Sequence, residues 1–313
     1  MAKKLKMLAT NTISFKEGFE EYIQDCKARN LRQGTIRHYN DSIKQIWKYI
    51  PEDTEIKDIT QETFDGFKRA LRANEAINDM SLYTYSRDLK TLLRFFMKQG
   101  WLPRMELQLA KVDKTPTETY TDDELAILLK KPNVKKCNFT EYKSWVIVNF
   151  LLSTGIRQNS LINIKIKDID WAAGVIRVAV TKNRKPLLLP LNSDIERILK
   201  EYIKYRQAED DNEYLFCNEY GNQLVKSTLY HSLYEYNQKR GVKRTGIHRF
   251  RHTFAKKWVL MGGNVVSLQK ILGHSSLEIP QNYLNLLVSD VARDAEEINI
   301  LREFKSQAIK MKV

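Results

Sequence analysis

The sequence predicts a mainly α-helical protein of two domains, with a small antiparallel β-sheet in the second domain. Two observations predict this fold class. Apolar residues recur at helical spacing through residues 14–101 and again from residue 192 onward, whereas residues 164–191 alternate as strands do. A chain of 313 residues, 42% of them hydrophobic, is also long enough to bury two cores.

Residues 14–101 are expected to form an N-terminal helical domain, preceded by a tail over residues 1–13. Apolar residues follow four successive helical segments separated by polar residues, glycine or proline. Ser14 and Glu17 have the spacing of a capping box before the first segment, and Pro51 ends the second. The polar faces carry many Arg and Lys residues, which would suit contact with DNA phosphates but are also typical of solvated helices.

Residues 102–119 have no sustained apolar period and contain Pro103 and Pro116, so we place the linker between the domains there. The second domain is expected over residues 120–287. Residues 288–313 continue an apolar pattern at helical spacing. They are expected to form a C-terminal helix or tail, which could dock on a neighbouring copy in trans or pack on its own domain.

A change of period inside the second domain predicts the small sheet. Three strands are expected at residues 164–169, 175–180 and 187–191, joined by turns at 172–174 and 183–186. Because short turns connect these strands, the sheet should be antiparallel.

The composition indicates a polyanionic partner. There are 52 basic against 38 acidic residues, giving a formal net charge of +14. Nucleic acid is favoured over a membrane, because no stretch approaches the length of a transmembrane span and no signal-peptide pattern is present. The three cysteines are widely spaced, which supports neither a disulfide framework nor a zinc ribbon. We therefore expect a cytoplasmic protein.

A glycine followed by an arginine stands at the end of one predicted buried helix. In the segment Ser153-Thr154-Gly155-Ile156-Arg157, the glycine lets the chain turn sharply. The guanidinium group of Arg157 has the shape that best fits two phosphate oxygens. The alternative is a cation that only caps the helix C-terminus.

Lys182 lies in the predicted turn between the second and third strands. An exposed lysine at a hairpin tip could reach a DNA backbone. Exposed hairpin lysines are also common, so Lys182 alone indicates little.

The segment His248-Arg249-Phe250-Arg251-His252 predicts a helical turn with an anion site. His248, Arg251 and His252 should share one face, while Phe250 points to the core. Two histidines at this spacing also occur in zinc-binding helices. Here, however, Arg249 replaces the glutamate of that motif and Arg251 adds a second positive charge, which disfavours a metal ion.

The segment Leu272-Gly273-His274 is followed, nine residues after the histidine, by Tyr283. Pro280 suits the first turn of a helix, which would hold Tyr283 near a helix N-terminus, where a phosphate is favoured. The alternative is a half-buried core aromatic, the ordinary role of one tyrosine among 15.

In motif order, spacing and domain layout, the chain resembles the tyrosine recombinase (phage integrase) family over almost all of residues 14–303. It resembles the small two-domain type without an arm-binding domain. One position departs from the family pattern, because Ser160 stands where an acidic residue is usual. This leaves open how the first arginine is held. The matching site positions are Arg157, Lys182, His248, Arg251, His274 and Tyr283.

The resemblance implies a mechanism and assigns each of these residues a role. The two arginines, with His274, would bind the non-bridging phosphate oxygens. Tyr283 would attack the phosphorus to give a 3′-phosphotyrosyl link and a free 5′-hydroxyl. Lys182 is the candidate general acid and His248 the candidate base. Because the covalent link conserves the energy of the broken phosphodiester, we expect no ATP, metal or other cofactor.

The resemblance also implies partners. We expect a site-specific recombinase that integrates or excises a mobile element or resolves DNA dimers, in a bacterial, phage or archaeal setting and associated with the nucleoid. It would bind double-stranded DNA with a specific core site, the core-binding and catalytic domains forming a C-shaped clamp. It would act as a homotetramer on DNA and be a monomer or dimer when free. The alternatives are a catalytically silent DNA-binding protein of the same fold and a type IB topoisomerase-like relaxing enzyme.

Overall fold

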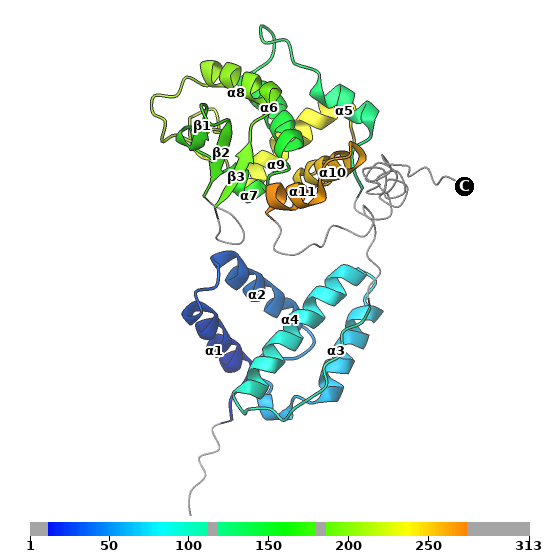
Figure 1. The fold of residues 1–313 in the computed structure, drawn as a ribbon. Coiled ribbons are helices and arrows are strands. Elements are labelled where there is room, and N and C mark those ends of the chain that lie inside the picture. Colours follow the sequence, from blue (N-terminus) through cyan, green and yellow to red (C-terminus); the bar gives the residue numbers. More distant parts are fainter. Residues whose placement is uncertain (1–11, 112–117, 180–185, 274–313) are drawn as a thin grey trace, which may run out of the picture. The chain divides into compact units, whose positions relative to one another are not determined.

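The computed structural model describes residues 12–111, 118–179 and 186–273. Internal contacts divide the chain into two compact units, Met1–Thr115 and Pro116–Val313. Figure 1 shows the helices of the first unit and the mixed elements of the second. Within the described ranges, no helix combines the length and the apolar character needed to cross a membrane.

The first unit is helical, as the apolar spacing predicted. The predicted capping box at Ser14 and Glu17 is confirmed: the Ser14 hydroxyl accepts from the Glu17 N–H at 3.2 Å, and the Glu17 carboxylate accepts from the Ser14 N–H at 2.8 Å. These two bonds fix where the first helix begins. The elements are α1 (Phe15–Ala28), α2 (Gln33–Ile46), the 3₁₀ turn η1 (Ile56–Asp58), α3 (Gln61–Ala73) and α4 (Asp79–Lys98).

The core of the first unit reaches beyond its last helix. Aromatic side chains such as Phe64 and Phe96 are fully buried in it. Leu102 and Leu107, which fall in the segment that we assigned to the linker, are only 5% exposed and belong to the same core. The pattern did not indicate this, because a segment without helix or strand can bury isolated leucines without any repeat.

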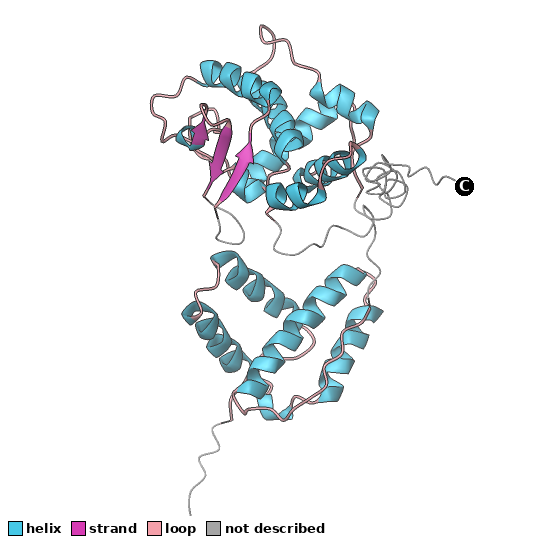
Figure 2. Cartoon of the chain, viewed as in Figure 1, coloured by secondary structure: helices cyan, strands magenta, loops and turns pink. Residues whose placement is uncertain are grey.

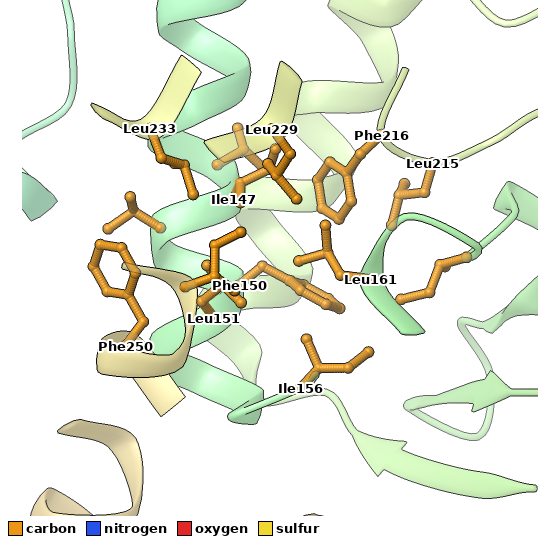
Figure 3. Packing of buried hydrophobic residues seen from close by; sticks show 14 of the residues in the cluster. Ile147, Phe150, Leu151, Ile156, Leu161, Leu215, Phe216, Leu229, Leu233 and Phe250 are labelled. Carbon is orange, nitrogen blue, oxygen red and sulfur yellow. The ribbon is translucent and has the colours of Figure 1, made fainter. Parts of the chain in front are cut away.

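The second unit is built around helix α6, which packs against α5, α8, α9 and α10. Ile147, Phe150 and Leu151 of α6 lie in the core, with Leu229 from α9 and Phe250 from α10 (Figure 3). A helix buried on every side is expected to be apolar all round. The helices are α5 (Asp122–Leu129), α6 (Phe139–Thr154), α7 (Gln158–Leu161), α8 (Ser193–Arg206), α9 (Lys226–Lys239), α10 (Ile247–Leu260) and α11 (Val265–Leu272).

The small sheet is antiparallel with strand order β1-β2-β3, as predicted, and its strands are grouped at one side of this unit (Figure 2). Ile176 of the central strand pairs with Ile169 on one side and Leu189 on the other. The strands are β1 (Ile169–Asp170), β2 (Val175–Val178) and β3 (Leu187–Pro190).

The prediction of a first strand beginning at Ile164 is wrong. Residues Ile166–Asp168 form the 3₁₀ turn η2, and only two residues follow as strand. The Asp168 carboxylate accepts a hydrogen bond from the Lys165 N–H at 2.8 Å, which closes the chain into a turn. Ile164 and Ile166 are both buried. Their spacing of two residues therefore reports burial and not strand geometry.

Gly155 ends α6 in the left-handed conformation, with φ 59°. A Cβ atom there would lie 2.4 Å from Cδ1 of Phe254 and 2.8 Å from Cδ2 of Leu272. Gly174, in the turn between β1 and β2, also has positive φ, 64°, but a Cβ there would meet nothing within 4 Å. A side chain at either glycine would strain the backbone, but only a side chain at Gly155 would also clash with its neighbours.

We expect Gly155→Ala to destabilise the protein more than Gly174→Ala. Both substitutions place an L-residue in the left-handed region, at a cost of about 1–2 kcal/mol. Only Gly155→Ala should add the cost of overpacking, about 1–3 kcal/mol. Urea denaturation followed by circular dichroism measures both losses, and equal losses would contradict the packing described for Gly155.

Candidate active site

Three of the six predicted site residues lie in the described part of the chain, and the structure brings them together at the second unit. Arg157 follows the end of α6 as the N-cap residue of α7, and His248 and Arg251 lie in α10. The described residues are Arg157, His248 and Arg251; Lys182, His274 and Tyr283 lie outside the described residues.

Arg157 lies where two glycine bends meet. After Gly155 ends α6, Arg157 is the N-cap residue of the short helix α7. Its Nη1 donates to the carbonyl oxygen of Leu272 at 2.9 Å and to that of Gly273 at 3.3 Å. Gly273 ends α11 in the left-handed conformation, with φ 59°. The prediction that Gly155 terminates a buried helix just before this arginine is confirmed.

Arg251 is buried beside it, with 7% of its surface exposed. Its Nη1 donates to the carbonyl oxygen of Gly155 at 2.6 Å, and its Nη2 donates to that of Leu272 at 2.8 Å. The Leu272 carbonyl therefore accepts from both Arg157 and Arg251. Carbonyl groups hold the guanidiniums in place without cancelling their charge, because a carbonyl contributes only a dipole.

The two guanidiniums lie in an environment that disfavours uncompensated positive charge. Desolvation and then the charge of Arg157 lower the pKa of Arg251 to about 9, and desolvation also lowers the pKa of Arg157. Both groups remain protonated at neutral pH. An anion bound there would relieve the repulsion, so the pair suits phosphate oxygens.

The histidines of α10 are affected by the same charges. Desolvation, followed by the charges of Arg251 and Arg157, lowers the pKa of His248, and desolvation, His248 and Arg251 lower that of His252. His248 is exposed and His252 half-buried. Phe250 is completely buried, as predicted. The lowered pKa keeps the imidazole neutral at pH 7. A general base must be in this neutral state to accept a proton.

Ser160, the position that departs from the family pattern, lies in α7 and is 5% exposed. Its N–H donates to the carbonyl oxygen of Arg157 at 2.9 Å, within the first turn of that helix. The guanidinium itself is anchored by the carbonyl groups of Leu272 and Gly273. Backbone carbonyl groups therefore hold Arg157, although Ser160 stands where the family usually has an acidic residue.

Sequence reasoning missed the acceptors of the site. The carbonyl groups of Gly155 and Leu272 orient the arginines, yet a backbone carbonyl has no residue signature. The glycines at 155 and 273 were the available signal, because a left-handed bend turns nearby carbonyls away from the helical hydrogen-bond pattern. Among the residues that the structure describes, no group of three or more His, Cys, Asp and Glu could hold a metal ion.

Two family models match the chain. Residues 118–289, more than half of the sequence, match the phage integrase family. Residues 14–113 match the phage integrase SAM-like domain. The first match contains the whole of the candidate site.

Named relatives cover most of the chain. It is 29% identical to the tyrosine recombinase XerA of Pyrococcus furiosus, over 91% of this chain and 95% of the relative. It is 28% identical to the tyrosine recombinase XerA of Saccharolobus solfataricus, over 83% and 85% respectively. With the XerC tyrosine recombinase of Leptospira interrogans it shares 25% identity, over 87% and 90%.

Solved structures share the fold at lower sequence identity. The Tn1549 transposon integrase in complex with transposon right-end DNA has a TM-score of 0.74 and 17% identity, covering 90% of this chain and 99% of that one. A lambda integrase tetramer bound to a Holliday junction has a TM-score of 0.71 and 18% identity, covering 88% and 78%.

We expect His248→Gln to make the stability of the free protein less sensitive to acid. Because the pKa of His248 is lowered by folding, its imidazole is neutral in both states above about pH 6.5. As the pH falls below that value, the unfolded chain binds the proton first, so the wild-type protein loses stability down to the lower, folded-state pKa. The variant lacks this loss. Urea denaturation at a series of pH values tests it, and parallel curves for the two proteins would refute the expectation.

Proposed function

The chain belongs to the phage integrase family, and from this premise we propose that it is a site-specific recombinase that cuts and rejoins DNA through a 3′-phosphotyrosyl intermediate on Tyr283. The convergence of Arg157 and Arg251 on one carbonyl oxygen is the observation that carries the proposal. The two arginines are 94 positions apart in the sequence, and the fold brings their guanidiniums to the same atom.

The arginines act on the phosphate. Their charges stabilise the non-bridging oxygens as negative charge builds up in the five-coordinate transition state. Both groups are held by backbone carbonyls before DNA arrives, so little reorganisation is needed at the moment of reaction. His274 is proposed as a further donor to the same oxygens.

Bond making and breaking follow from the proposed roles. The phenolic oxygen of Tyr283 attacks the phosphorus while its proton passes to His248. The bond from phosphorus to the 5′ oxygen breaks, and Lys182 donates a proton to the leaving oxygen. The products are a 3′-phosphotyrosine and a free 5′-hydroxyl. Attack by a 5′-hydroxyl reverses these steps and rejoins DNA, so the proposal needs neither ATP nor a metal.

We further propose double-stranded DNA with a specific core site as the partner, with four copies acting together. Strand exchange between two duplexes involves four cleavages, one at each strand. The tetramer of lambda integrase on a Holliday junction and the DNA complex of the Tn1549 integrase support this proposal through their shared fold. Movement of a mobile element and resolution of DNA dimers both fit this chemistry.

We expect Tyr283→Phe to abolish the covalent adduct and to leave DNA binding nearly intact, because only the attacking oxygen is removed. A nicked suicide substrate, which prevents religation, traps the adduct for gel electrophoresis. Tyr220→Phe is the matched control, since Tyr220 is 79% exposed in the second unit. An adduct that persists in Tyr283→Phe would refute Tyr283 as the nucleophile. Absence of any adduct with the wild-type protein would favour the silent DNA-binding alternative.

We expect Arg157→Gln to slow adduct formation by about a hundredfold to a thousandfold, the loss seen when one donor to a developing oxyanion is removed. The reason is the missing charge on the transition state. Arg177→Gln on β2 is the control, because that arginine is exposed and pairs with Asp170 at 3.1 Å. Single-turnover rates on the suicide substrate provide the measurement. A loss of less than about tenfold would show that Arg157 does not bind the reacting phosphate.

A further inference from the structure

Helix α10 has a second polar face, which holds the beginning of the second unit. Positions 249, 253 and 257 follow one another at intervals of four residues and so share one side of the helix. The segment from residue 118 to residue 122 runs along them. Its contacts are the Glu118–Arg249 ion pair at 2.9 Å, the hydrogen bond from the Tyr120 N–H to the Thr253 hydroxyl at 3.0 Å, and the Asp122–Lys257 ion pair.

Glu118 lies between two arginines at the N-terminal end of this face of α10. Its Oε2 is 2.9 Å from Nη1 of Arg249 and 3.3 Å from Nη1 of Arg244. The hydrogen bond from Arg249 and the charges of both arginines lower the pKa of the Glu118 carboxyl. The Arg249 guanidinium also lies 6.0 Å from the ring centre of Tyr120. Two cationic groups therefore converge on one carboxylate oxygen.

The geometry around Glu118 also suits a phosphate. A guanidinium group binds carboxylate and phosphate oxygens with the same fork of donors. The Glu118 and Arg244 side chains are 62% and 46% exposed, so their pairing is screened by solvent and easily exchanged. Arg249 is less exposed, at 22%, and its guanidinium also lies near the Tyr120 ring, a contact that does not depend on Glu118.

We propose that Arg244 and Arg249 form a second DNA-phosphate subsite beside the active site, and that Glu118 occupies it in the free protein. This rests on the proposed function. Arg249 follows His248 directly in the first turn of α10, so a duplex bound at the active site passes close to this subsite. A backbone phosphate displaces the Glu118 carboxylate and takes its two arginine partners.

Displacement of Glu118 frees only the first contact of the segment. The Tyr120 ring remains packed against the Phe250 ring, with 4.4 Å between ring centres and the planes tilted by 31°, and the Tyr120 N–H remains bonded to Thr253. Glu118 falls in the segment that we expect to link the two domains. DNA binding at this subsite thereby releases the end of the linker from α10 while its anchor at Tyr120 stays in place.

The test compares DNA binding by the full-length wild type, Glu118→Gln, Arg249→Gln and the double variant at several salt concentrations. Glu118→Gln should bind a core-site duplex about fivefold more tightly, the factor that corresponds to one surface ion pair. Arg249→Gln should bind more weakly and reduce the salt slope by about one. The loss of DNA affinity caused by Arg249→Gln should be larger in the Glu118→Gln background than in the wild type. In the wild type, part of the affinity that Arg249 provides is spent on displacing Glu118, whereas in the Glu118→Gln background the whole contribution of Arg249 is lost.

A matched pair on another helix controls for net charge. Asp194 and Arg197 on α8 form an exposed ion pair at 3.0 Å. Asp194→Asn and Arg197→Gln change the formal charge in the same way, so their effects on DNA binding should be small and additive. Arg244→Gln repeats the test at the second arginine if Arg249→Gln folds poorly.

The outcomes separate this subsite from the proposed function. If Glu118→Gln and Arg249→Gln act additively and match the α8 pair, or if Glu118→Gln weakens binding, the subsite is overturned while recombination stands. If the wild type neither binds DNA nor forms an adduct, the proposed function itself fails. Tighter binding by Glu118→Gln with a coupled loss at Arg249 supports the subsite.

Discussion

The carbonyl oxygen of Leu272 is the point on which the site depends. It accepts hydrogen bonds from Arg157 and from Arg251, which belong to segments far apart in the sequence. Two guanidiniums repel one another in a desolvated environment, so their proximity requires fixed acceptors on the backbone. Left-handed bends at Gly155 and Gly273 present those acceptors. The same bends end α6 and α11, so the positioning of charge and the packing of the unit depend on the same residues.

Helix α10 connects the site to the rest of the unit because its sides make different contacts, with the core, with the carbonyl groups of the site and with Glu118. Phe250 is buried in the core and fixes the rotation of the helix. That rotation brings Arg251 to the carbonyl groups of the site and brings Arg249 to Glu118. A change in the packing of one side therefore moves the polar groups on the others. The described acceptors of Arg251 are the backbone carbonyls of Gly155 and Leu272, and such a positively charged group suits an anion such as the phosphate of the proposed reaction.

Local patterns were sufficient to predict most of the fold. Helical spacing of apolar residues predicted the helices of both units, and the side chains of Ser14 and Glu17 fixed a helix start through bonds to nearby backbone. The prediction failed at residues 164–168, because buried residues two apart occur in a turn as well as in a strand. It also did not predict the burial of Leu102 and Leu107, because a segment without helix or strand has no apolar period to detect.

The sequence by itself determined the helical and strand segments and the family, and motif order predicted Arg157 and Arg251, among many cations, as phosphate-binding candidates that lie together. Only the tertiary structure decided which backbone groups hold them. It also decided that Glu118 meets Arg249, a contact between residues 131 positions apart. The physical reason is that periodicity and capping act over a few residues, whereas contacts between distant segments depend on how the helices pack. Packing around α6 and α10 brings these segments together.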